Sequence, residues 1–313
     1  MSTKYNWIWV ALLLALSLPV LAGEKERELR EAATVGDVVE LQQLLAAGAD
    51  PTAPNKYGKT ALMMAVENGN IAAASLLVSQ GADVNYKTVA GCTALTFAAE
   101  NGETELSALL LEKGADMQAR TRAGWNSLMI ASRYGLDDMV EQLLFKGANT
   151  AERDKQGDTA LMMAAAKGHL KVVQMLVGAK AQVDAKNAHG QTALMLAAVG
   201  GHTGVMQALL HAGAKVDTVS NDGATALIWA AGERQLEAAR LLLAAGAQVN
   251  AQDVDGTSAL MEAVSVRDVD MVRLLMQAGA DPSLKNREGE TAADMARHSR
   301  SLQLLEVLTR AAG

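Results

Sequence analysis

The sequence contains a single cysteine, Cys92, among 313 residues. One thiol excludes a disulfide within the chain. Aromatic residues are also scarce, at 3% of the chain, although half of all residues are hydrophobic. The core must therefore be built from Ala, Leu, Val and Met, and its stability must come from the packing of these side chains.

Positive charge is in deficit as well. The formal net charge is −7, and it becomes −8 (−7 − 1) without the first 22 residues, in which Lys4 is the only charged side chain. Nucleic acids bind basic surfaces, so they are not expected as general partners. The sequence also lacks Gly-x-Ser-x-Gly, His-Glu-x-x-His and a phosphate-binding loop. We expect a protein that is not an enzyme and that needs no cofactor.

Residues 1–22 have the three-part layout of a secretory signal peptide. Lys4 precedes an uncharged apolar run, and Val20 and Ala22 are the small residues expected at the cleavage positions. The run is close to the lower limit for crossing a membrane, so an uncleaved anchor is the alternative. No cysteine follows Ala22, which argues against a lipoprotein signal. We predict cleavage before Gly23 or Glu24, and export to a bacterial periplasm or secretion of a chain without a further membrane segment.

A pattern of 33 residues repeats along the rest of the chain without insertions. A fixed period of this length is typical of a repeat solenoid, in which each unit packs only on its neighbours. One glycine marks each unit, and these marker glycines are Gly58, Gly91, Gly124, Gly157, Gly190, Gly223, Gly256 and Gly289.

Each unit predicts two helices. A Thr, Ser or Asn two residues after the marker glycine, such as Thr159, can cap the first helix. A turn glycine such as Gly168 precedes the second helix, whose paired leucines (Leu209 and Leu210, for example) lead to a left-handed cap at Gly213. An Asp, Asn, Ser or Thr three residues before each marker glycine suits a tight turn in the link between units.

The consensus Gly-x-Thr-Ala-Leu-Met-x-Ala-Ala-x-x-Gly-His, followed by Leu-Leu-x-x-Gly-Ala-x-Val-x-Ala, resembles the ankyrin repeat along essentially the whole chain after residue 22. The resemblance implies an all-α solenoid of stacked helix–turn–helix units with hairpin-like loops, about nine units with degenerate caps, and a concave binding face. It implies one ankyrin-repeat domain over 23–313, with an N-terminal cap over 24–55, repeats over 56–286 and a C-terminal cap over 287–313.

The family's usual Thr-Pro-Leu-His reads Thr-Ala-Leu-Met in this chain. Proline only pre-sets the start of a helix, so its loss does not affect the fold. Thioethers can bind soft metal ions, but methionine also fills cores, and its recurrence at one helical position favours packing. The methionines concerned are Met63, Met129, Met162, Met195 and Met261.

Two histidines and the cysteine complete the set of reactive side chains. His169 and His202 stand at the repeat's own histidine position, so structural roles are expected. Cys92 directly follows Gly91 and is expected on a loop tip. An exposed thiol in an oxidising compartment could serve a redox or intermolecular disulfide role. An incidental thiol is the alternative.

By the resemblance, partners meet the loop tips and the exposed side of the first helix. At those positions Lys56, Tyr57 and Lys59 are basic or aromatic. Acidic residues interrupt the series at Glu67, Glu100 and Asp158. Tryptophan, tyrosine and arginine are common interface anchors, so the series predicts a surface for a partner protein with an acidic surface. Ordinary solvated charges are the alternative. The third to fifth marked units hold the residues that we call the basic–aromatic strip: Arg120, Arg122, Trp125, Arg133, Tyr134, Arg153, Lys155, Lys167, Lys186 and His189.

The centre of the strip is placed at Arg122, Trp125, Arg133 and Tyr134, none of which the repeat needs for folding, so all four are expected to be exposed. The function predicted is a non-catalytic scaffold for protein–protein interaction. An inhibitor or immunity-type protein that blocks an enzyme is one alternative. An alternative of another class is a metal or redox accessory protein that uses the methionines and Cys92, which a copper titration would test.

Four basic residues stand where other units have glycine. Arg234, Arg267 and Arg300 occupy the turn position, and Lys180 occupies the position after a second helix. A left-handed backbone costs a residue other than glycine on the order of 1 kcal/mol. We therefore predict faster amide hydrogen exchange in the C-terminal third than in the middle units.

Overall fold

The computed structural model describes residues 23–298 and 301–310. The predicted signal peptide, residues 1–22, lies outside the described residues. Within the described residues the chain forms helices and no strand, apart from an isolated bridge between Gln252 and Ser258. None of the described helices combines the length and the apolar character needed to span a membrane.

The chain divides into two compact units, which we call unit 1 (Met1–Ala131) and unit 2 (Ser132–Gly313). Unit 1 begins with a described helix over 23–35 and continues with α2 (Val38–Ala46), α3 (Ala61–Glu67), α4 (Ile71–Ser79), α5 (Ala94–Asn101) and α6 (Thr104–Glu112). The boundary falls inside α7 (Ser127–Tyr134). Unit 2 continues with α8 (Asp137–Phe145), α9 (Ala160–Lys167), α10 (Leu170–Gly178), α11 (Ala193–Val199), α12 (Thr203–His211), α13 (Ala226–Gly232), α14 (Leu236–Ala244), α15 (Ala259–Ser265), α16 (Val269–Gln277), α17 (Ala292–His298) and α18 (Leu302–Arg310).

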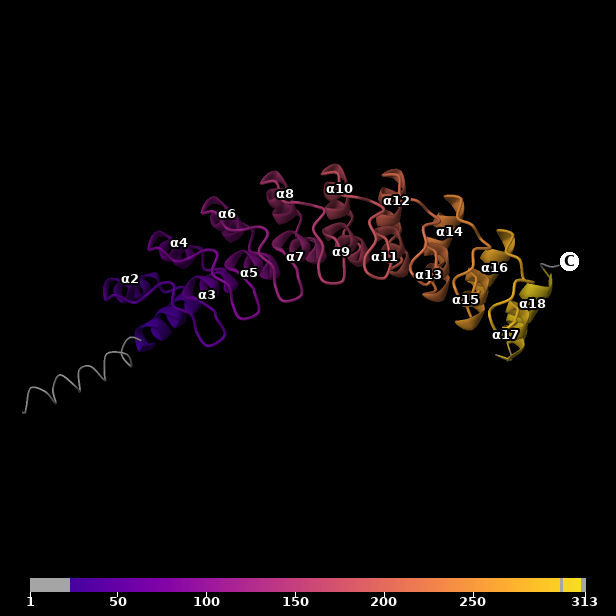
Figure 1. Ribbon diagram of the computed structural model, residues 1–313, viewed down its shortest axis with the longest axis horizontal. Helices are drawn as coiled ribbons and strands as arrows, with labels where there is room; N and C mark the ends of the chain where they lie inside the picture. Colours follow the sequence, from indigo (N-terminus) through magenta and orange to yellow (C-terminus); the bar gives the residue numbers. More distant parts are fainter. Residues whose placement is uncertain (1–22, 299–300, 311–313) are drawn as a thin grey trace, which may run out of the picture. The chain divides into compact units, whose positions relative to one another are not determined.

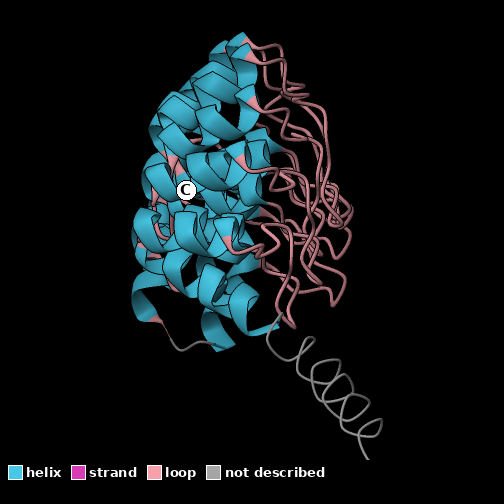
Figure 2. Ribbon diagram, turned by 90° about the vertical axis from the view of Figure 1, so that its left-hand side faces the viewer, coloured by secondary structure: helices cyan, strands magenta, loops and turns pink. Residues whose placement is uncertain are grey.

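Helices stack in two rows within each unit. In unit 2 the first helices of successive repeats, α9, α11, α13, α15 and α17, pack on one another, and the second helices form a parallel row (Figure 1). In unit 1, α3 packs on α5, and α2, α4 and α6 form the second row. The loops between repeats leave the helices on one side (Figure 2). The predicted all-α arrangement of stacked helix pairs is confirmed.

The predicted capping residues act as expected. The Thr159 hydroxyl accepts a hydrogen bond of 3.3 Å from the Met162 amide, which satisfies one of the free donors at the start of α9. At the end of α12, Gly213 has φ +88°, and the Ala214 amide donates to the Leu209 carbonyl at 3.0 Å. This left-handed cap satisfies the last carbonyls and turns the chain into the link.

The links form hairpin-like loops that are joined to their neighbours through backbone hydrogen bonds. The Asp154 amide donates to the Asp158 carbonyl at 3.0 Å, and the Asp154 carboxylate accepts from the amides of Gln156 and Asp158, each at 2.8 Å. The Ala188 amide of the next loop then donates to the Gln156 carbonyl at 2.8 Å. This loop is therefore ordered by its own turn and by the loop that follows it.

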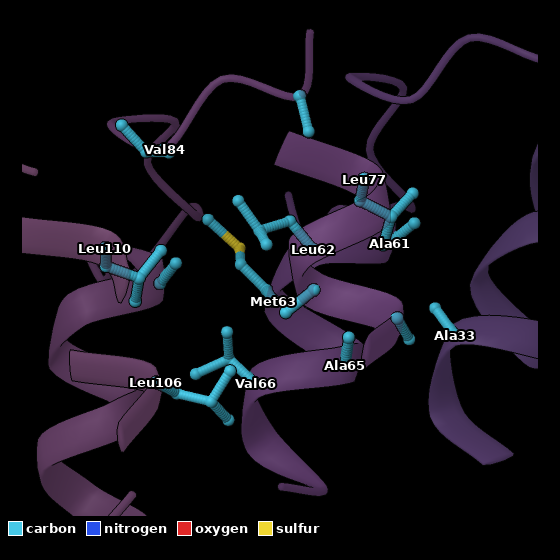
Figure 3. Close-up of a cluster of buried hydrophobic side chains, with 14 of the residues drawn as sticks. Ala33, Ala61, Leu62, Met63, Ala65, Val66, Leu77, Val84, Leu106 and Leu110 are labelled. Carbon is cyan, nitrogen blue, oxygen red and sulfur yellow. The ribbon is translucent and has the colours of Figure 1, made fainter. Parts of the chain in front are cut away.

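The core consists of small and aliphatic residues, as the composition requires. In unit 1, Met63 lies among Leu62, Leu106 and Leu110 (Figure 3). Its exposed fraction is only 1%, and the same holds for the four other methionines at this position of the repeat. The prediction that these methionines pack in the core is confirmed.

The predicted left-handed residues are found where glycine is missing. Lys180, Arg234 and Arg267 have φ values of 62°, 58° and 56°. Arg300 lies outside the described residues. The fold therefore keeps the same turn geometry in these repeats and accepts the backbone strain.

Candidate functional site

In unit 1 the N-terminal members of the strip differ widely in exposure. Arg122 is exposed, and Arg120 is half-buried with its Nη1 donating to the Gly124 carbonyl at 3.1 Å. Trp125 is half-buried, and its backbone pairs with Thr121 at the base of the loop. The expectation that Trp125 is fully exposed is therefore wrong, because part of its surface is covered in the fold.

The series that extends the strip toward the N-terminus forms contacts within unit 1. The Lys56 Nζ lies 5.0 Å from the centre of the Tyr57 ring. The Lys59 Nζ forms an ion pair of 2.6 Å with Glu67 and lies 4.7 Å from the centre of the Phe97 ring. Lys59 is thus partly neutralised by its own repeat, whereas Tyr57 remains 62% exposed.

In unit 2 the members of the strip are mostly exposed. Tyr134 is 53% exposed at the end of α7, and Lys155, Lys167 and His189 are exposed on the loops and at the end of α9. Arg133 is half-buried, and its carbonyl lies 3.0 Å from the His169 Nε2. This part of the strip therefore combines one exposed aromatic ring with several basic side chains.

Two other members of the strip connect neighbouring loops. The Arg153 Nη1 donates to the Gly157 carbonyl at 2.9 Å and to the Lys186 carbonyl of the next loop at 2.6 Å. The Lys186 Nζ donates to the Val219 carbonyl at 2.7 Å, one loop further along. The side chains of Arg153 and Lys186 therefore also brace the stack of loops, in addition to the partner contact predicted for them.

Asp158 lies among the basic residues of unit 2. Burial raises the pKa of the Asp158 carboxyl, the hydrogen bond of 2.8 Å from the Asn187 amide group lowers it, and the negative charge of Asp154 raises it. The charges of His189 and Arg133 lower the pKa by smaller amounts. Two predicted site residues, Arg133 and His189, therefore lie within electrostatic reach of one half-buried carboxylate.

We expect Asp158→Asn to stabilise the protein at neutral pH. A raised pKa means that folding disfavours the ionised carboxyl, so this group costs stability above its folded pKa and the cost disappears as the pH falls to the unfolded value. The asparagine can still accept the hydrogen bond from Asn187. Chemical denaturation at several pH values should show a gain at pH 7 that shrinks as the pH falls through the raised pKa.

The exposed Asp138 on α8 offers the matched control, because Asp138→Asn removes the same charge without removing a buried one. An equal gain at pH 7 in both variants would show that the net charge, and not the burial of Asp158, is responsible.

Cys92 is not on the loop tip, contrary to expectation. Its amide donates to the Thr88 hydroxyl at 3.0 Å, and its carbonyl accepts from the Thr88 amide at 2.9 Å, so it pairs across the base of the loop. The residue is half-buried against the core of unit 1. Burial raises the pKa of the Cys92 thiol, and the nearby charge of Glu100 adds to this effect. Because the thiolate is disfavoured, the thiol is poorly suited to exchange chemistry.

The repeat histidines have the structural roles that were expected. The His169 Nε2 lies 3.0 Å from the Arg133 carbonyl, and the His202 Nε2 lies 3.3 Å from the Ala166 carbonyl of the preceding repeat. Each imidazole thereby satisfies a carbonyl near the end of a first helix and joins two repeats.

Sequence reasoning missed two small cavities beside Trp229 on α13. Each has a volume of about 210 Å³. One is lined by residues that include His189, Gln191 and Ser220, and the other by residues that include Asp253 and Glu262. The sequence did contain an indication of these cavities: one repeat combines Trp229 with the small residues Ala224 and Gly232.

Comparison with protein-family models finds matches to a model described as "Ankyrin repeats (3 copies)", over residues 29–121, 128–220, 184–253 and 206–286. No curated protein matches the chain. The matched segments cover most of the sequence and coincide with the stacked helix pairs, their capped first helices and their ordered loops. The chain therefore belongs to the ankyrin repeat family.

Proposed function

We propose that this protein is a non-catalytic scaffold that binds a partner protein through its loops and the exposed sides of its first helices. Ankyrin repeats are generally modules for protein–protein interaction, and proteins built from them are typically not enzymes. The observation that carries the proposal is the exposed set Tyr134, Lys155, Lys167 and His189 in unit 2. An exposed aromatic ring among cations is the composition that protein interfaces favour.

The order of the loops supports this proposal. Backbone hydrogen bonds join neighbouring loops within unit 2, for example from the Asn221 amide to the His189 carbonyl at 2.9 Å. The side chains of Arg153 and Lys186 add further links. A surface that is already ordered loses little conformational entropy on binding, so more of the contact energy is available for affinity. The positive charge of the strip favours a partner with an acidic surface.

The proposal includes export of the protein, to a bacterial periplasm or outside the cell. Its support is the signal-like composition of residues 1–22. N-terminal sequencing of the protein from its native host is the test, with Gly23 or Glu24 expected as the first residue. A protein that begins at Met1 would overturn this part of the proposal.

The partner can be captured from the native host with the full chain and identified by mass spectrometry. Tyr134→Ala should then weaken binding by about 2 kcal/mol, or roughly 30-fold, because truncation of an interface anchor costs that much. Lys155→Glu combined with Lys167→Glu should slow association with an acidic partner. Isothermal titration and association kinetics measure the two effects.

Phe145 and Lys146 supply matched controls at the end of α8. Phe145 is an exposed aromatic residue, with 88% of its surface accessible, and Lys146 is an exposed cation. Phe145→Ala and Lys146→Glu should leave binding unchanged. If the control variants and the strip variants bind equally well, the strip is an ordinary solvated surface. Trp125→Ala is a poorer probe because the half-buried indole also contributes to packing.

The two alternative functions lead to different results. An inhibitor or immunity-type protein would capture an enzyme and reduce its activity. A metal or redox accessory protein is not favoured, because the repeat methionines are buried and the Cys92 thiol is disfavoured from ionising. Among the described residues, we find no feature that supports a metal or redox function.

A further inference from the structure

The cavity on the Glu262 side of Trp229 is a pocket with an aromatic wall and acidic surroundings, entirely within unit 2. We call it the acidic pocket. Its volume of about 210 Å³ is open on the side of the loops and first helices. The lining residues that matter for the argument are Trp229 and Gly232 on α13, Glu262 on α15, and Ala224, Asp222 and Asp253 on the loops before these helices.

Small residues at two repeat positions, Ala224 and Gly232, line the pocket and leave room for it. Ala224 follows its marker glycine directly, where other repeats have Trp125 or Asp158. Gly232 stands nine residues after the same glycine, where the repeat that contains Trp125 has Arg133. A Cβ atom added to Gly232 would lie 3.3 Å from the Glu262 Oε2, so even an alanine would crowd this carboxylate.

The aromatic wall and the carboxylate also occupy equivalent repeat positions. Met163 and Leu196 hold this position in the two preceding repeats, followed by Trp229 and then Glu262. A buried or half-buried position of the first helix that is apolar in the two preceding repeats thus changes to an indole beside a negative charge. The Trp229 Nε1 is buried and has no hydrogen-bond acceptor among the described residues.

No ion pair compensates the negative charge of the pocket within the described part of the chain, although Asp253 accepts hydrogen bonds from the amides of Asp255 and Thr257. Glu262 is half-buried, and the hydrogen bond that its carboxylate accepts among the described residues is a long one of 3.4 Å from the Ser265 hydroxyl. Burial raises the pKa of Glu262, and the charge of Asp253 adds to this effect. Among the described residues, none of Asp222, Asp253 and Glu262 forms an ion pair. A half-buried carboxylate without a cation is costly, and a cationic ligand would remove that cost.

We propose that the acidic pocket binds an arginine side chain of the partner protein. A guanidinium group is planar and stacks on an indole, and it donates several hydrogen bonds in a fixed geometry that suits carboxylates. The proposal rests on the proposed function as a protein-binding scaffold. It adds that the partner carries a basic residue as well as the acidic surface that the strip would bind.

The test uses the full chain and a fluorescein-labelled peptide, Gly-Gly-Arg-Gly-Gly, followed by fluorescence anisotropy. A second peptide has citrulline in place of arginine, which keeps the shape of the side chain and removes its charge. Hydrogen bonds from a charged guanidinium to a half-buried carboxylate are stronger than those from a neutral group. We therefore expect the arginine peptide to bind about tenfold or more tightly than the citrulline peptide. Equal binding of the two peptides would overturn the proposal.

Three variants locate the binding to the pocket. Glu262→Gln keeps the shape of the side chain, Trp229→Leu introduces the residue that the preceding repeat has at this position, and Gly232→Val fills the cavity. Each should weaken binding of the arginine peptide by about tenfold. Glu237→Gln on α14 is the matched control, since it removes the same charge from an exposed site. Thermal melting verifies that each variant folds, and Glu262→Gln decides the outcome if the other two do not fold.

The result is separable from that of the proposed function. Lys155→Glu with Lys167→Glu changes the strip and leaves the pocket intact, so it should not weaken binding of the arginine peptide. One outcome is that the arginine peptide binds as expected while the strip variants still capture the partner. In that case the strip is not the partner-binding surface, and the proposal for the acidic pocket is supported. If Glu262→Gln binds both the peptide and the partner like the parent protein, the acidic pocket is not an arginine site. The proposed scaffold function is unaffected by that result.

Discussion

Gly157→Ala should destabilise unit 2 by roughly 2–5 kcal/mol, which combines about 1–2 kcal/mol for a left-handed alanine with about 1–3 kcal/mol for overpacking. Gly157 has φ +77°, and a Cβ atom built on it would lie 2.9 Å from the Ala188 backbone nitrogen. That nitrogen donates to the Gln156 carbonyl at 2.8 Å. The next loop cannot withdraw from the new methyl group without losing this hydrogen bond, so both costs apply.

Gly213→Ala is the matched control for this prediction. Gly213 has φ +88°, but nothing lies within 4 Å of its added Cβ atom. Gly213→Ala should therefore lower the free energy of unfolding only by the cost of a left-handed alanine, about 1–2 kcal/mol. Denaturation with urea gives both free energies of unfolding, and hydrogen exchange at the Ala188 amide reports whether the contact between loops is lost. Equal costs for the two variants would mean that the loops adjust freely and that their close stacking contributes little.

Replacing Lys180, Arg234 and Arg267 with glycine should together stabilise unit 2 by about 2–3 kcal/mol, since each relieves a left-handed backbone that costs on the order of 1 kcal/mol. The gain at Arg234 should be the smallest, because its guanidinium donates to the Val266 carbonyl. Val266 directly precedes Arg267, so these two substitutions are coupled and should be measured separately as well as together.

Lys146→Gly is the control for these substitutions and should change the free energy of unfolding in the opposite direction. Lys146 follows α8 with φ −77°, whereas Lys180 has φ 62° just after α10. Glycine at Lys146 relieves no strain and only increases the freedom of the unfolded chain, so it should be destabilising. Hydrogen exchange should also show faster exchange in the C-terminal repeats of the parent protein than in the middle ones, and the triple variant should narrow this difference. If Lys180→Gly and Lys146→Gly change stability in the same direction, the left-handed strain is not a significant cost.

The fold could be predicted from the sequence because its determinants are local. A hydroxyl at Thr159 caps the helix that follows it, and a glycine at Gly213 ends the helix that precedes it. The interactions that they make lie within a few residues along the chain, and the same interactions recur in successive repeats. Even the left-handed Lys180 followed from its place in the period.

The candidate site could be predicted only in part, because exposure depends on the neighbouring repeat. The side chains of Arg153 and Lys186 reach carbonyls about one repeat away, so their bracing role is a tertiary contact. Trp125 is half-buried for a similar reason, since its position in the period does not say how the ring packs. The period places the residues of the strip along the loops and first helices, but the partners of their side chains were not visible in the pattern.

The period, the helix caps, the left-handed turns and the aliphatic core could be read from the sequence, because each depends on short-range backbone geometry or on hydrophobic residues at fixed spacing. The tertiary structure alone decided that Cys92 is half-buried, that Arg153 braces its neighbour and that a cavity opens between Trp229 and Glu262. These features depend on the sizes and charges of side chains that stacking brings together from residues about 33 positions apart.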